Sequence, residues 1–83
     1  MKTTNMNRIN IIKLLVILSD KINGCIRTSK SGVPHIVVKH SHVTYSVCYF
    51  AKWNKYRVFY PYPDSNQTKK TLNTQNEVIE FFK

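Results

Sequence analysis

The side chains best suited to chemistry are cations and aromatic rings that alternate in the middle of the chain. In the segment 48–59, CYFAKWNKYRVF, basic residues stand among phenylalanine, tyrosine and tryptophan. Lysine and arginine neutralise phosphates, and aromatic rings stack on bases, so this mixture is typical of a surface that contacts nucleic acid. The candidate nucleic-acid or partner-binding residues are Arg27, Lys30, Lys39, Phe50, Lys52, Trp53, Lys55, Arg57, Phe59, Lys69 and Lys70.

The chain as a whole is strongly basic. It carries 13 Lys and Arg residues against 4 Asp and Glu residues, for a formal net charge of +9 among 83 residues. An excess of this size repels itself in the folded state and favours a negatively charged partner, such as nucleic acid or an acidic protein surface. The alternative interpretation is a charge that serves solubility alone, which rarely needs so large an excess.

Enzymatic chemistry finds little support in these residues. The 4 acids form no obvious catalytic pair, and 2 glycines are too few for a Gly-rich phosphate loop. In the strand register described below, His35 falls opposite Cys48, but nothing nearby supplies an oxyanion hole. We therefore predict no catalytic residue, no cofactor and no enzymatic activity.

Metal and disulfide chemistry are also weakly indicated. His40 and His42 have the spacing with which a strand points two imidazoles one way, yet further ligands are missing, so we expect them in a hairpin turn and predict no metal site. The 2 cysteines, Cys25 and Cys48, are too few for a disulfide scaffold. We expect buried or half-buried thiols in a reducing cytosol, with a bridge between them as the alternative.

A three-stranded antiparallel meander over 33–62 is the element expected to position the candidate residues. The first hairpin, with its turn at Ser41-His42, places Val38 opposite Tyr45. The second, with its turn at 52–55, places Tyr49 opposite Val58. Although the two hairpins are aligned independently, they agree on one apolar face. That face consists of Ile36, Val38, Tyr45, Val47, Tyr49, Val58 and Tyr60.

The opposite face of this meander is mixed, basic and partly aromatic. Its basic and aromatic members form the predicted binding face. Two interpretations of Phe50 and Phe59 stay open: they stack on bases, or they lie under the closing helix, with the cations as a solvated rim. The face consists of His35, Val37, Lys39, Thr44, Ser46, Cys48, Phe50, Lys52, Lys55, Arg57 and Phe59.

Helices are predicted at both ends of the chain. The segment 8–22 has a wide apolar side, and Asn23-Gly24 is a helix stop. The sequence Thr74-Gln75-Asn76-Glu77 predicts a capping box before a short closing helix. Of the remaining segments, 25–28 is expected to be a short strand or a crossover, 29–32 a turn, 64–73 a polar loop, and 1–7 a frayed start.

The first helix has a rival interpretation as a signal peptide. Lys13 interrupts its apolar run, and Asp20-Lys21 stand where apolar residues are needed. A transmembrane span needs roughly 18 consecutive apolar residues, which this segment lacks. We therefore expect a cytoplasmic protein without a membrane partner.

The predicted order of one helix, three strands and one helix is similar to that of the double-stranded-RNA-binding domain. Arm-type integrase domains share the sheet followed by a helix. The first family implies a lysine-rich start to the last helix, which grips phosphate. Here that start is Thr74-Gln75-Asn76-Glu77, which places negative charge at the same point. We assign the chain to neither family, because element order alone does not define one.

The sequence as a whole predicts a single small α+β domain over 1–83, with an N-terminal helix, a three-stranded sheet and a short C-terminal helix. The expected function is non-enzymatic binding of nucleic acid, mainly through phosphates. The alternative is a small inhibitor of phage or mobile-element type that docks on an acidic surface of a larger protein complex. Under either expectation, a homodimer can form along an exposed sheet edge.

Overall fold

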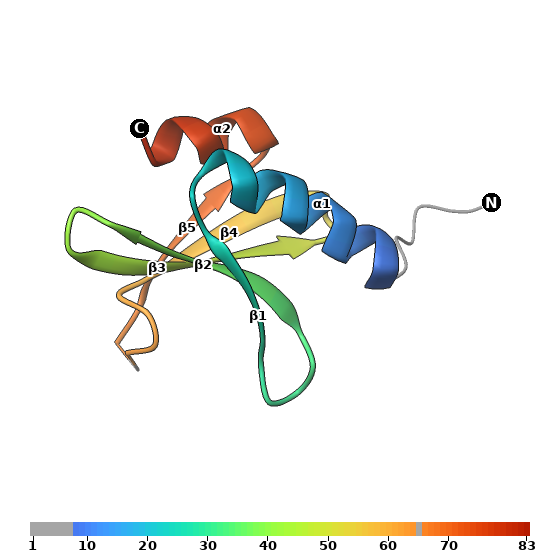
Figure 1. Cartoon of the computed structure of the whole chain (residues 1–83), viewed down its shortest axis with the longest axis horizontal. Helices are drawn as coiled ribbons and strands as arrows, with labels where there is room; N and C mark the ends of the chain where they lie inside the picture. The colour runs from blue at the N-terminus through green and yellow to red at the C-terminus, as the bar shows by residue number, and fades with distance from the viewer. Residues whose placement is uncertain (1–7, 65) are drawn as a thin grey trace.

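The computed structural model describes residues 8–64 and 66–83. The frayed start that the sequence predicts for 1–7 lies outside the described residues. Along the described residues, one helix precedes five consecutive strands and a second helix follows them (Figure 1). The elements are α1 (Arg8–Lys21), β1 (Cys25–Thr28), β2 (Pro34–His40), β3 (Val43–Phe50), β4 (Lys55–Tyr60), β5 (Thr68–Leu72) and α2 (Gln75–Phe81).

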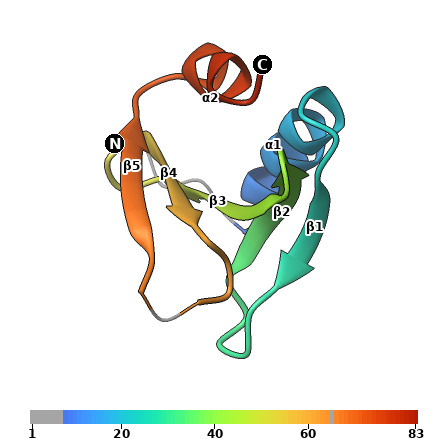
Figure 2. The same ribbon diagram turned by 90° about the vertical axis from the view of Figure 1, so that its left-hand side faces the viewer.

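The sheet is an antiparallel meander in the order β1-β2-β3-β4-β5. Both helices lie on one side of this curved sheet, while the β1–β2 and β4–β5 loops hang on the other side (Figures 1 and 2). The predicted α+β class, with a helix at each end, is confirmed. The predicted number of strands is wrong, because the meander has five strands and not three.

β5 is the strand that the sequence analysis missed. We predicted a polar loop over 64–73, whereas Thr68–Leu72 pairs with β4 along its whole length. Only Leu72 of this strand is buried, so no alternation of apolar and polar residues marks it. Lysines on an edge strand are usual, since they discourage pairing with another chain. The segment 25–28, expected to be a short strand or a crossover, is the strand β1 and pairs with β2.

The register of the first hairpin agrees with the prediction. Val38 lies opposite Tyr45, and the turn residues Ser41 and His42 have φ values of 52° and 68°. Positive φ at both central residues is the geometry of the two-residue turn that matches strand twist. The predicted hairpin turn at these residues is therefore confirmed.

The second hairpin is shifted by two residues from its predicted register. Tyr49 lies opposite Tyr56, and not opposite Val58, because the loop is 51–54 instead of 52–55. Asn54 closes this loop with a φ of 51°, and its side-chain oxygen accepts a 2.8 Å hydrogen bond from the Tyr49 hydroxyl. A shift of two leaves every side chain on its predicted face, so the apolar face remains correct.

One hydrophobic core joins that apolar face to both helices. Leu15 and Leu18 of α1 and Val78 of α2 are fully buried against the sheet. Full burial of one such side chain contributes about 1.5–3 kcal/mol. None of the described helices has the length and apolar character needed to span a bilayer. The core consists of Leu15, Leu18, Ile22, Ile36, Val38, Val47, Tyr56, Val58, Leu72 and Val78.

The end of α1 uses Asn23 and Gly24 in different ways. The predicted helix stop at these two residues is confirmed, and Asn23 takes the left-handed conformation, with a φ of 58°. The Gly24 amide then donates a 2.8 Å hydrogen bond to the Ser19 carbonyl, which closes the helix in a Schellman motif. Gly24 is needed for close packing, because a Cβ there would lie 2.4 Å from Cγ2 of Ile36.

This close approach predicts that Gly24→Ala destabilises the fold. The added methyl group also meets Cγ2 of Val38 at 2.8 Å, so β2 or α1 must shift. We expect the free energy of unfolding to fall by about 1–3 kcal/mol, measured by urea denaturation. Lys30→Ala, at an exposed loop residue, is the control and should change it by less than about 0.5 kcal/mol. Equal stability of both variants would contradict the packing argument.

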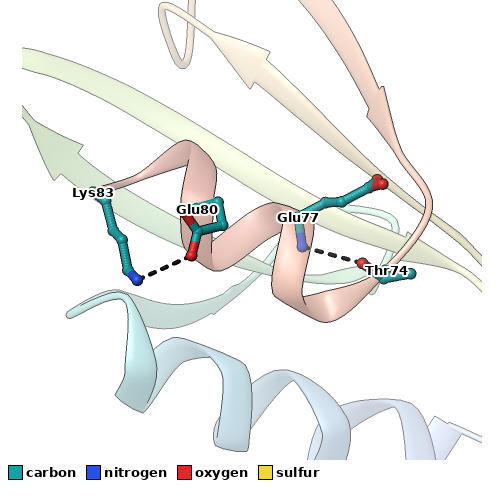
Figure 3. Close-up of polar contacts among 4 residues, drawn as sticks. All are labelled: Thr74, Glu77, Glu80 and Lys83. Atoms are coloured by element: carbon teal, nitrogen blue, oxygen red, sulfur yellow. Dashed lines mark hydrogen bonds and ion pairs between the residues drawn. The ribbon is translucent and has the colours of Figure 1, made fainter.

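The predicted cap by Thr74 at the start of α2 is confirmed, while the Glu77 carboxylate reaches back to Asn73, one residue before the cap. The Glu77 amide donates a 3.1 Å hydrogen bond to the Thr74 hydroxyl (Figure 3). The Glu77 carboxylate in turn accepts a 2.6 Å hydrogen bond from the backbone amide of Asn73. At the other end, Lys83 and Glu80 form an exposed ion pair. Because a helix as short as α2 is marginally stable by itself, its cap and the burial of Val78 stabilise it.

Removal of the cap should therefore weaken the fold more than removal of the ion pair. We expect Thr74→Ala to lower the free energy of unfolding by about 1 kcal/mol, since the Glu77 amide loses its acceptor. Lys83→Ala should lower it by less than about 0.5 kcal/mol, because an exposed pair contributes little. Chemical denaturation of both variants tests this order, and the reverse order would contradict it.

Candidate functional site

The face of the sheet turned away from the helices is the candidate site. Because α1 and α2 both pack on the apolar face, no helix in the described part of the chain covers the opposite one (Figure 2). The interpretation that places Phe50 and Phe59 under the closing helix is therefore wrong. Both rings are half-buried, and they lie on the uncovered face. We call this surface the open face.

The acidic residues of the chain all lie outside the strands. The 4 acids lie in the helices and in the β4–β5 loop, at Asp20, Asp64, Glu77 and Glu80. Within residues 8–64 and 66–83, no cation of the open face forms an ion pair. The positive charge of this face is therefore not neutralised by acids of its own.

The predicted binding residues divide among four places. Lys30 lies in the β1–β2 loop, and Lys52 and Trp53 lie in the loop between β3 and β4. Lys70 pairs with Val58, which places it on the helix side of the edge strand and away from the open face. The strand register brings the others together on the open face: Arg27, Lys39, Phe50, Lys55, Arg57, Phe59 and Lys69.

A run of stacked cations and rings occupies the end of the open face beside the β3–β4 loop. The Arg57 guanidinium carbon lies 5.2 Å from the centre of the Phe50 ring. Phe50 contacts Trp53, with ring centres 5.7 Å apart, and the Lys52 ammonium lies 5.7 Å from the Trp53 ring. Each cation–ring contact contributes about 0.5–1 kcal/mol at exposed sites. We call Arg57, Phe50, Trp53 and Lys52 the cation–aromatic ladder.

The ladder retains polar groups with which to bind a ligand. Trp53 is 55% exposed at the tip of the hairpin. The Nε atom of Arg57 is buried and has no hydrogen-bond partner within the described part of the chain. Lys55, beside Arg57 in the sequence, donates to the side-chain oxygen of Asn73. Aromatic surface next to cations suits a ligand that has both rings and anionic oxygens.

A hollow of about 220 Å³ lies between the β1–β2 and β4–β5 loops. A backbone hydrogen bond of 2.8 Å, from the Tyr62 amide to the Thr44 carbonyl, ties the second loop to β3. The floor of the hollow is formed by His35, Ser46, Cys48 and Phe59. Its walls are Ser29, Val33, Tyr62 and Gln67. We call it the loop hollow.

Sequence reasoning found the floor of the loop hollow but not its walls. The predicted alternation placed His35, Cys48 and Phe59 on one face. Tyr62 and Gln67 belong to the β4–β5 loop, whose position depends on how β4 and β5 are placed in the sheet. The two consecutive Tyr-Pro pairs at 60–63 are the signal that could have indicated an ordered loop, since proline restricts the backbone.

His35 and Cys48 share the loop hollow without forming the thiol–imidazole pair considered from the sequence. The Nε2 atom of His35 lies 3.2 Å from the Tyr62 hydroxyl, and its Nδ1 atom lies 3.2 Å from the Val33 carbonyl. Burial raises the pKa of the Cys48 thiol, although its hydrogen bond to Ser46 and the charge of Arg57 lower it in part. The neutral thiol is therefore favoured at neutral pH.

The remaining histidines and Cys25 have separate surroundings. His40 contacts the rings of Tyr45 and Phe82, whereas His42 is exposed in the β2–β3 turn. Among residues 8–64 and 66–83, no three His, Cys, Asp or Glu side chains gather as metal ligands would. Both cysteines are free thiols, and Cys25 is exposed, contrary to the expectation of burial.

Comparison of the chain with protein-family models, with curated proteins and with solved structures found no match.

The surroundings of the two thiols predict different reactivity. Cys48 is half-buried and its pKa is raised, whereas Cys25 is exposed, so iodoacetamide should alkylate Cys25 faster at about pH 8. The rates are measured by mass spectrometry on Cys25→Ser and Cys48→Ser variants, each with one thiol. Raising the pH should speed the reaction at Cys48, because the thiolate is the nucleophile. Equal rates would contradict the burial of Cys48.

Proposed function

We propose that this chain is a small, non-enzymatic nucleic-acid-binding protein and that the open face is its binding surface. The observation that carries the proposal is the uncovered, acid-free sheet face on which cations and aromatic rings lie together. Phosphates meet the cations of the open face, which include Lys55 and Arg57, while rings of the ladder offer stacking surface to bases. Most of these contacts reach the backbone, so sequence preference is modest.

A salt titration tests this proposal directly. We expect binding to labelled DNA and RNA, single-stranded and duplex, that weakens linearly in log affinity with log salt. The slope gives about 0.9 per phosphate contact on duplex DNA and about 0.7 on single strands. A protein that uses four or five cations should therefore lose roughly a hundredfold in affinity between about 50 and 200 mM salt.

Single charge removals then locate the surface. Arg57→Ala and Lys55→Ala should each weaken binding by a similar factor on unrelated sequences and reduce the salt slope by about 1. Lys13→Ala is the matched control, because it removes one charge from an exposed position on α1, on the helix side. If Lys13→Ala weakens binding as much as the other two, net charge alone drives association, and the open face is not the site.

A second candidate follows from the exposed ring at the hairpin tip. Tryptophan and arginine are the residues that most often anchor protein interfaces, and Trp53 is 55% exposed next to the ladder. This candidate is a small inhibitor that docks on an acidic surface of a larger protein complex. It predicts no binding to nucleic acid near physiological salt and retention on an immobilised acidic polypeptide, which Trp53→Ala weakens. Tight, salt-dependent binding to nucleic acid would contradict it.

A further inference from the structure

We propose that the loop hollow receives one unpaired nucleobase, so that the open face binds single strands in preference to duplexes. This inference rests on the proposed function and assigns its substrate class. It concerns a different part of the open face from the cation–aromatic ladder, and it draws on the size, lining and surroundings of the hollow.

The size of the loop hollow matches one ring system. Its volume of about 220 Å³ is below the roughly 300–1,000 Å³ of pockets that enclose drug-sized ligands. Two aromatic rings line it, Phe59 from β4 on the floor and Tyr62 from the β4–β5 loop in the wall. Proteins that recognise unpaired bases commonly stack them on such rings, because every base has an aromatic face.

The chemistry of the lining matches a neutral, hydrogen-bonding guest. Among residues 8–64 and 66–83, no Lys, Arg, Asp or Glu lines the loop hollow. The Ser46 hydroxyl and the Gln67 amide offer both donors and acceptors, which the edge of a base requires. The Cys48 thiol on the floor stays protonated because of its burial, so it adds no charge. A phosphate would find no cation inside, whereas a base finds stacking and polar partners.

The cations of the open face stand beside the hollow, where the flanking phosphates would pass. Lys69 pairs with Phe59 on one side. Arg27 pairs with His35 on the other, and Arg57 pairs with Cys48, so that its side chain shares the open face with this floor residue. A single strand can place a base in the hollow while its backbone follows these cations. The bases of a duplex are paired and stacked, so they reach the hollow only after unpairing, which costs a few kcal/mol.

The experiment uses the whole chain with Cys25→Ser, so that Cys48 is the remaining thiol. Three probes of about twelve nucleotides are compared: a mixed single strand, the corresponding duplex, and an abasic strand with the same phosphates. We expect the single strand to bind at least about fivefold more tightly than the abasic strand, since stacking of one base contributes this much. It should also bind more tightly than the duplex.

Alkylation of Cys48 reports directly on occupancy of the loop hollow. At saturating concentrations, the single strand should slow the reaction with iodoacetamide at least fivefold, and the abasic strand should leave it unchanged. Phe59→Leu keeps an apolar side chain but removes the stacking ring, so it should abolish the protection of Cys48 by the single strand. Phe81→Leu, on α2 at the helix side, is the matched control and should retain it.

The outcomes separate this inference from the proposed function. If all three probes bind alike, with a steep salt slope and no protection of Cys48, the base-binding hollow is overturned while the phosphate-binding face stands. Tighter binding of the duplex than of the single strand overturns it as well. If none of the probes binds, the proposed function and this inference fall together.

Discussion

The rest of the structure depends on the burial of two helices on one face of one sheet. The meander has a single apolar face, and α1 and α2 each have one apolar side, so a common core satisfies all three. Residues 8–64 and 66–83 contain no further helix or strand with which to form a layer on the other side. The opposite face is therefore left uncovered, and its composition becomes a property of the molecular surface.

The charge distribution gives that uncovered face its character. The acids lie in α1, α2 and the β4–β5 loop, while the strands carry lysine and arginine alone among the charged residues. The half-buried rings of Phe50 and Phe59 remain accessible because no helix lies over them. One end of the face holds stacked cations and rings, and the region between the β1–β2 and β4–β5 loops holds a neutral hollow. Both kinds of contact suit a nucleic acid strand, which presents phosphates and bases together.

Prediction from the sequence succeeded where a short-range pattern specified the structure. The two-residue turn at Ser41-His42 set the first hairpin, and the Thr74–Glu77 capping box set the start of α2. It failed where the pattern was degenerate. The loop of the second hairpin could close at 51–54 or 52–55 with the same face buried, so the register slipped by two. The sequence did not predict β5, because an edge strand needs only backbone pairing and its lysines resemble those of a polar loop.

The sequence by itself determined which side chains share a face, where α1 ends and α2 begins, and that the strands are basic. These properties follow from strand alternation, capping and charge, all of which act between residues close in the chain. Only the tertiary structure decided that both helices cover the same face and that the loop hollow exists. The hollow depends on contacts such as that between His35 and Tyr62, which are 27 residues apart. No local pattern encodes such a contact, because it arises when the curved sheet brings two loops to the same side.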